Sequence, residues 1–484
     1  MSILEPGRNC WRIEPATRAT VIVDAERYFK MARAAMLKAR SQILLVGWDF
    51  DARIDLTPDG DVSDGAPRTI GDFIYWLVQR NPGLRVYTLR WDTGAIKTLG
   101  RGSTIFTIAK WMMHKRIATK LDGYHPFGGS HHQKIIVIDD CLAFAGGIDM
   151  TSERWDTREH RDDQPHRTVP GGKKQYKPWH DATTALAGPV AKALGELCRD
   201  RWELAGGGRL PAPAQAEDCW PEALEIDFTD VEVAISRSEP EMPDRQPVLE
   251  IEHLYLDLIA SAKRTIYAES QYFASRKIAE ALARRLDEPD GPEIVIINPT
   301  TAQGWLEPIA MDSARARLIE ALRHRDVHQR LRMYHPVTAG GEPIYVHAKI
   351  LVIDDEVLRV GSSNFNNRSM RLDTECDVTI DADHGADRAC IISIRDGLIA
   401  EHLGVAPELV AARIIETGSL IAAIEGLRGE GRSLIDYEVP DVGAVEKWLA
   451  DNEVLDPEGP AEMFEGFSKR GLFRRPWRWL WRRR

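Results

Sequence analysis

The 484-residue chain contains one pattern of segments twice, and this duplication constrains the fold more than any other feature. The repeated segments are 32–50, 73–92 and 131–157 in the first copy and 255–273, 278–299 and 346–375 in the second. They keep their order and begin 205–223 residues apart. Alternating helical and strand-like stretches predict an α/β fold. We expect two similar halves, each a mixed sheet flanked by helices, packed with pseudo-twofold symmetry around a site at their interface.

Segments rich in proline and glycine mark the expected boundary between the halves, at 205–222 and 237–247. A polar, turn-rich stretch at 156–178 has no counterpart in the second copy and is expected to be an inserted loop. The predicted organisation is an N-terminal half over 1–205, a linker over 206–247, a C-terminal half over 248–435 and an extension over 436–484.

Both halves contain the spacing H-x-K-x-x-x-x-D at the start of an apolar run. The motif residues are His132, Lys134 and Asp139 in the first half and His347, Lys349 and Asp354 in the second. The second copy has Val346 where the first has His131, so the repeat selects His132 as the chemical residue. His131 is then a neighbour of the site. A merely structural cap on a strand would not require this whole frame twice.

Strand geometry assigns roles within this candidate catalytic set. Side chains alternate along a strand, so His132 and Lys134 share one face, and the same holds in the second half. Asp139 and Asp354 have the opposite parity, at the far end of the run. We therefore expect the two aspartates to brace the turn that follows and not to contact the imidazoles.

A catalytic imidazole needs a group that orients it, usually a carboxylate. The strand after the inserted loop begins near Asp181, and the matching strand of the second half begins near Glu375. We expect Asp181 to orient His132 and Glu375 to orient His347. A surface acid at the start of a strand is the alternative for each carboxylate.

Two ammonium groups in one cleft require an anion between them, and a phosphate presents several oxygens to such donors. Ser362, Asn364 and Asp149 follow the motifs and are expected to help hold that phosphate. No carboxylate cluster with metal-ligand spacing accompanies the motifs, so we expect no metal and no cofactor in the reaction.

With these motifs, the chain resembles the phospholipase D superfamily, the HKD enzymes, over about residues 30–435. The segments "SHHQK", "GGIDM", "PWHD" and "GSSNFNNRSM" are similar to the eukaryotic-type catalytic core. The resemblance implies cleavage of the phosphate–headgroup ester of glycerophospholipids through a phosphohistidine, with water or an alcohol as acceptor. It also implies that His132 is the nucleophile and that His347 is the general acid and then the base.

Three alternatives stay open: a nuclease or other phosphodiesterase, a phosphatidyltransferase such as a cardiolipin synthase, and a non-catalytic membrane-binding protein. The net charge of −11 argues against nucleic acid as a partner. No run approaches the roughly 18–20 apolar residues of a membrane span, which a cardiolipin synthase would normally carry. Two intact motifs argue against a protein without catalysis.

The last sixteen residues carry eight lysines and arginines, no acid and three tryptophans. Tryptophan favours the lipid–water interface, and basic residues favour anionic lipids. We therefore expect the tail to bind an anionic membrane surface; a solvated tail or an RNA-binding arm is the alternative. The expected protein is a monomer in the cytoplasm, peripheral on a membrane, with export by a non-Sec route left open.

Overall fold

The computed structural model describes residues 3–60, 64–92, 104–172, 174–214, 218–302, 311–382 and 385–439. The strands of the first half are β1 (Arg12–Val23), β2 (Gln42–Gly47), β3 (Arg85–Trp91), β4 (Ile117–Asp122), β5 (Ile135–Ile138), β6 (Leu142–Gly146), β7 (Trp179–His180) and β8 (Ala182–Ala187). The strands that follow are β9 (Phe228–Glu239), β10 (Val248–Leu249), β11 (Thr265–Glu269), β12 (Glu293–Ile297), β13 (Leu331–Val337), β14 (Tyr345–Val346), β15 (Ile350–Ile353), β16 (Val357–Gly361), β17 (Glu375–Asp381) and β18 (Ser433–Asp436). The helices are α1 (Ala25–Lys38), α2 (Ile70–Arg80), α4 (Thr104–Met112), α5 (Pro189–Leu204), α6 (Glu250–Ser261), α7 (Arg276–Asp287), α8 (Ser313–Arg325), α9 (Asn367–Arg371), α10 (Gly385–Leu403), α11 (Pro407–Thr417) and α12 (Leu420–Leu427).

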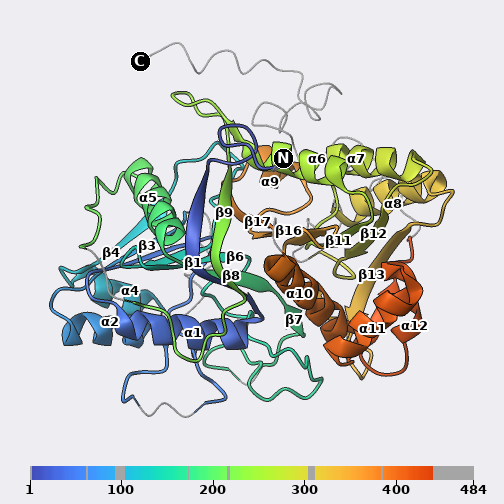
Figure 1. Cartoon of the computed structure of the whole chain (residues 1–484). Coiled ribbons are helices and arrows are strands. Elements are labelled where there is room, and N and C mark those ends of the chain that lie inside the picture. The colour runs from blue at the N-terminus through green and yellow to red at the C-terminus, as the bar shows by residue number, and fades with distance from the viewer. Residues whose placement is uncertain are drawn as a thin grey trace, which may run out of the picture.

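A single mixed sheet of sixteen strands runs through the described part of the chain. Its order is β18-β13-β12-β11-β15-β16-β17-β9-β1-β8-β6-β5-β2-β3-β4, with β10 beside β9. Outward from the centre, β1-β8-β6-β5-β2-β3-β4 in one half matches β9-β17-β16-β15-β11-β12-β13 in the other. The two central strands pair antiparallel, from Arg12↔Ile235 to Ala19↔Phe228. Antiparallel pairing of equivalent strands is a local twofold, so the predicted α/β fold of two similar halves is confirmed, and Figure 1 shows β1 and β9 side by side at its centre.

The predicted linker over 206–247 is wrong for residues 228–239. These residues form β9, which pairs with β1 on one side and with β17 on the other. The stretch "DVEVAIS" alternates polar and apolar residues as strands do, but Pro/Gly-rich segments on both sides conceal it. The duplicated unit therefore begins one strand earlier than the motifs indicate, at β1 and β9.

Helices cover both faces of the sheet. In the first half, α1, α2 and α4 pack on one face through residues such as Phe29, Phe73 and Trp111. In the second half, α6, α7 and α8 pack on the equivalent face. The largest cluster of buried apolar side chains lies between α5, α10 and the central strands, and it draws on both halves. This shared core fixes the halves against each other.

Among the described residues, no helix has the length and apolar character that crossing a membrane requires. The basic, tryptophan-rich tail, for which membrane binding is predicted, lies outside the described residues.

Candidate active site

The two motif strands, β5 and β15, place the histidines and lysines at the junction of the halves. The side chain of His132 is 16% exposed and that of His347 is 6% exposed, whereas both motif lysines are almost fully buried. Each lysine donates from Nζ to the backbone carbonyl of the histidine in its own motif, over 2.7 Å for Lys134. Lys349 also donates to Oε1 of Gln271 at 3.2 Å.

Each imidazole is held by a carboxylate from the opposite half. Nδ1 of His132 lies 2.9 Å from both carboxylate oxygens of Glu375. Nδ1 of His347 lies 2.6 Å from Oδ2 of Asp181. The expectation that each carboxylate serves the histidine of its own half is therefore wrong, although the two carboxylates themselves are in the site.

Backbone hydrogen bonds between the halves explain the exchange. The N–H of His132 donates to the carbonyl of Thr374 at 3.0 Å, and that of His347 donates to the carbonyl of His180 at 2.7 Å. Thr374 directly precedes Glu375, and His180 directly precedes Asp181. The parallel pairing of β7 with β14 places His180 opposite Val346, the residue before His347. Each carboxylate is thus carried to the histidine by a short strand contact that no reading of one half alone can predict.

Small residues give the carboxylates room. A Cβ on Gly147 would lie 2.2 Å from Oδ1 of Asp181, so only glycine fits there. At the equivalent position, Ser362 donates from Oγ to Oε2 of Glu375 at 2.5 Å. Ser362 is fully buried and therefore steadies a carboxylate, in place of the predicted phosphate contact.

The motif aspartates brace neighbouring backbone. Asp139 accepts from the N–H groups of residues 40–42 at 2.6–2.8 Å. Asp354 accepts from those of residues 263–265 at 2.7–2.9 Å. Both residues have a positive φ, 51° and 54°. The carboxylates thus fix the entry to β2 and to β11, rather than only their own turns.

Of the other predicted phosphate ligands, Asp149 has a different environment from the one expected. One oxygen accepts from the backbone N–H of Trp48 at 3.0 Å, and the other lies 3.5 Å from Nζ of Lys134. A carboxylate repels phosphate, so Asp149 positions the lysine. The structure puts Asn364, 2% exposed, at the equivalent position, and its Oδ1 has no hydrogen-bond partner among the described residues.

Arg154 and Trp179, which are not among the predicted site residues, lie beside His347. The guanidinium of Arg154 lies 4.2 Å from the centroid of the Trp179 ring, and that ring lies 5.1 Å from the imidazole of His347. Trp48 approaches His132 edge-on at 6.3 Å. Aromatic walls therefore flank both imidazoles. Arg368 instead pairs with Asp373 and serves the fold.

His131 faces away from this site. It is fully buried, and its Nδ1 lies 3.0 Å from Oδ2 of Asp122, which Arg201 also holds.

Burial lowers the pKa of both motif imidazoles well below the ordinary histidine value. The ammonium groups of Lys134 and Lys349 lower the pKa of His132 further, and Lys349 and Arg154 do so for His347. Burial also lowers the pKa of Lys349 itself to about 7. Without an anion between the halves, the imidazoles are therefore neutral near neutral pH.

The orienting carboxyls shift in the opposite direction. Burial raises the pKa of Asp181, and it raises that of Glu375 to about 8, despite the nearby lysines. A carboxyl that is partly protonated leaves lysine charge uncompensated. The site is thus poised to receive a negative group.

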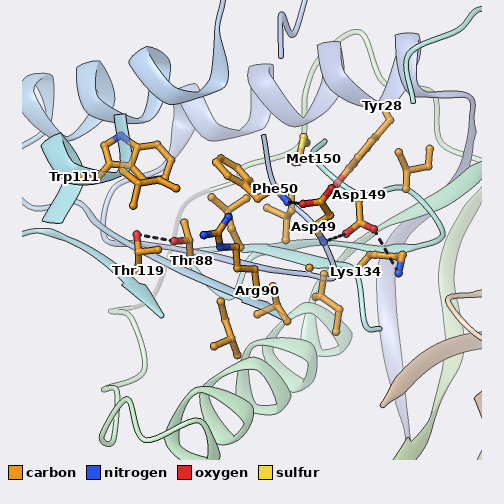
Figure 2. Close-up of a pocket in the computed structure, with 18 residues that line it drawn as sticks. Tyr28, Asp49, Phe50, Thr88, Arg90, Trp111, Thr119, Lys134, Asp149 and Met150 are labelled. Carbon is orange, nitrogen blue, oxygen red and sulfur yellow. Dashed lines mark hydrogen bonds and ion pairs between the residues drawn. The ribbon is translucent and has the colours of Figure 1, made fainter. Parts of the chain in front are cut away.

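A mostly apolar pocket reaches this site from the first half. Its cavity volume is only about 30 Å³, room for about one or two water molecules. Figure 2 shows Trp111 at one end of the pocket and the Asp149–Lys134 ion pair at the other. One motif lysine therefore lies at the boundary between an apolar wall and the polar centre.

Comparisons with known proteins agree with this geometry. The family model described as "Phospholipase D" matches residues 35–244, and the model described as "Cardiolipin synthase, PLD-like domain" matches residues 255–389. Phospholipase D alpha 1 of Carica papaya is 23% identical over 69% of this chain and 58% of its own length. Phospholipase D A of Dictyostelium discoideum is 22% identical over 80% of this chain and 36% of its own length. The chain thus spans little more than half of the papaya relative.

Among solved structures, the phosphatidylserine synthase of Haemophilus influenzae has the same fold. It superposes with a TM-score of 0.56 at 14% identity, over 84% of this chain and 95% of its own. One family model in each half, one HKD motif in each half and this shared fold lead to one conclusion: the chain belongs to the phospholipase D superfamily.

Proposed function

We propose that the protein is a phospholipase D-type phosphodiesterase that cleaves the phosphate–headgroup ester of glycerophospholipids through a phosphohistidine. One observation carries the proposal: two imidazoles, each anchored at Nδ1 by a carboxylate of the other half, next to two buried lysines. Anchoring at Nδ1 directs Nε2 of each ring away from the carboxylate, toward a substrate.

In the first step, Nε2 of His132 attacks phosphorus while Nε2 of His347 donates its proton to the leaving headgroup oxygen. In the second step, His347 removes a proton from water or an alcohol, which attacks the phosphohistidine and frees His132. The low pKa of His132 suits a nucleophile that must be unprotonated. The assignment of nucleophile and acid follows the superfamily resemblance.

The general acid must carry a proton, and substrate binding favours protonation of His347. Lys349 and Arg154 lower the pKa of His347 in the free site. A phosphodiester anion among these cations offsets their charge, so binding raises the pKa of His347. The two imidazoles then share one proton as a coupled pair.

Two features support a lipid substrate. Phe127, on the loop between β4 and His132, is 77% exposed near the motif. The net charge of −11 disfavours nucleic acid. Binding of the tail to an anionic membrane, a monomeric state and a peripheral cytoplasmic location are further parts of the proposal.

Phosphatidyl transfer to an alcohol is the second candidate, because the same phosphohistidine can be resolved by water or by an alcohol. The phosphatidylserine synthase named above has the same fold, which is compatible with either outcome. The acceptor must therefore be determined by experiment.

The test incubates the purified chain with phosphatidylcholine, phosphatidylethanolamine, cardiolipin or single-stranded DNA, with and without ethanol. We expect phosphatidic acid from lipid, and phosphatidylethanol when ethanol is present. His132→Ala and His347→Ala should each lower turnover by at least about 10³-fold, whereas His166→Ala, on the inserted loop, serves as the matched control. Cleavage of DNA but of no lipid would overturn the substrate, and substantial turnover by either motif variant would overturn the two-histidine mechanism.

A further inference from the structure

A second group of histidines and carboxylates is buried at the junction of the halves, outside the HKD site. It consists of Asp24 between β1 and α1, His160 on the inserted loop, His180 on β7 and Glu401 on α10; we call it the buried His/carboxylate cluster. All four side chains are at most 1% exposed. One nitrogen or oxygen of each lies within 4.8 Å of those of the others.

The separations within the cluster suit a single small cation. Oε1 of Glu401 lies 3.1 Å from Nε2 of His160 and 2.8 Å from Nδ1 of His180. Oδ2 of Asp24 lies 3.5 Å from the first of these nitrogens, and its Oδ1 lies 3.4 Å from the second. Tetrahedral zinc with nitrogen and oxygen ligands at about 2.0–2.1 Å requires separations of about 3.3–3.4 Å between ligand atoms. The separations from Asp24 match this value, and those from Glu401 would have to lengthen by a few tenths of an ångström when the cation binds.

Each histidine is oriented as metal ligands are. Nδ1 of His160 lies 3.1 Å from Oδ2 of Asp156, so its Nε2 faces the cluster. Nε2 of His180 lies 2.7 Å from Oε2 of Glu269, so its Nδ1 faces the cluster. Histidines that ligate metals almost always donate their other N–H to a carboxylate, a carbonyl or water, and here both do so to a carboxylate.

The two carboxylates follow the same rule. Oδ1 of Asp24 accepts from the backbone N–H of Asp181 at 3.0 Å, and Oε2 of Glu401 bonds Nε of Arg158. The other oxygen of Glu401 faces both imidazoles, whereas Asp24 directs Oδ2 toward His160 and Oδ1 toward His180. Oδ2 of Asp24 is buried and, in the part of the chain that the structure describes, has the Nε2 of His160 at 3.5 Å but no hydrogen-bond partner.

Two readings of this cluster make different demands. Beyond the guanidinium of Arg158, which pairs with Glu401, the positive charge that these carboxylates need comes from imidazolium protons or from one divalent cation. The cluster-facing protons of both imidazolium rings would point at Oε1 of Glu401, the nearest oxygen to Nε2 of His160 and to Nδ1 of His180, and would leave Oδ2 of Asp24 without a hydrogen bond from the described residues. A cation at the centre of the cluster would contact all four ligand residues and would give Oδ2 of Asp24 a partner.

We propose that the buried His/carboxylate cluster binds one zinc ion with four protein ligands, as a structural site. This site goes beyond the proposed hydrolysis and takes no part in its steps. Its place in the fold gives it a function: the carbonyl of His180 accepts from the N–H of His347, and Asp181 follows directly. Zinc would thus fix β7 to the inserted loop and to α10, and hold the carboxylate that orients His347.

The test measures metal in the full chain, purified without a metal-affinity column, by inductively coupled plasma mass spectrometry. We expect about one zinc per chain, a loss to below about one-tenth in His160→Gln, and full retention in His166→Gln on the same loop. Slow removal by a chelator should lower the melting temperature of the parent. Zinc X-ray absorption of the parent should show only nitrogen and oxygen ligands, two of them imidazoles.

Less than about one-tenth of a zinc in the parent, after incubation with zinc chloride and desalting, would overturn the site. So would zinc retained at full occupancy in His160→Gln, or a sulfur ligand in the absorption spectrum. If His160→Gln does not fold, the zinc content and ligand shell of the parent decide the question alone.

Discussion

Replacing the buried ammonium of Lys349 should stabilise the protein while removing its activity. Burial lowers the pKa of Lys349 from 10.5 to about 7, and the side chain is 1% exposed. At about 1.4 kcal/mol for each pKa unit, keeping this charge in the folded state costs on the order of 3–5 kcal/mol below pH 7. Lys349→Met removes that cost but deprives the carbonyl of His347 and Oε1 of Gln271 of a donor, about 1–3 kcal/mol. The net gain at pH 6 should be about 1–3 kcal/mol.

The sign of the pH dependence follows from linkage. Below pH 7 both the folded and the unfolded state hold the proton, so the cost is complete. Above pH 7 the folded state releases the proton while the unfolded state keeps it, so the stability of the parent rises. The advantage of Lys349→Met should therefore shrink by about 1.4 kcal/mol between pH 6 and pH 8.

Urea unfolding followed by tryptophan fluorescence at both pH values measures this difference. Lys263→Met, at an exposed position, is the matched control and should show no such pH-dependent gain. The reasoning fails if Lys349→Met is less stable than the parent at pH 6, or if its advantage is the same at pH 8. Either result would mean that the ammonium carries no desolvation cost in the folded site.

Three further outcomes follow from the site. Gly147→Ala should push Asp181 away from His347, because the new Cβ would lie 2.2 Å from Oδ1 of Asp181. This displacement should lower kcat by at least about 10-fold with little change in KM. An unchanged kcat would show that the carboxylate is not held as tightly as the structure indicates. Asp139→Asn weakens the hydrogen bonds to the backbone of residues 40–42, so the free energy of unfolding in urea should fall by about 1–3 kcal/mol. The variant should retain most of its activity. Loss of activity without loss of stability would instead give Asp139 a catalytic role. Burial lowers the pKa of both motif imidazoles, so the proton that they share is lost as the pH rises. The value of kcat/KM should therefore be greatest below about pH 6.5 and fall at higher pH. An optimum above pH 8 would contradict this assignment.

The sequence predicts the motif strands and the braces well because both depend on local order. An apolar run with a histidine and a lysine two residues apart sets one face of a strand wherever that strand lies. The opposite parity of Asp139 separates it from His132 in the same way. These features need no knowledge of what packs against the strand.

The partners of the imidazoles could not be predicted in this way, because they depend on how the halves dock. Asp181 and Glu375 were identified as carboxylates at strand starts, but the twofold delivers each to the other half's histidine. The position of Ser362 after the motif predicts a contact with phosphate, whereas its hydroxyl donates a hydrogen bond to Glu375 on the buried strand β17. β9 was hidden by the turn-forming residues on both sides of it.

The pairing of β1 with β9 gives the exchanged carboxylates a physical basis. Neither half alone holds an oriented imidazole, since each supplies a histidine and the carboxylate for the other. The geometry of such a site is kept only if the halves cannot shift against each other. A displacement of a catalytic group by about 1 Å can lower the rate by about 10²-fold. A flexible linker between two separate sheets would allow such a shift. One continuous sheet through an antiparallel pair of long strands prevents it, and the core shared by α5 and α10 adds a second constraint. The strand concealed in the apparent linker is therefore what allows the site to be divided between the two copies.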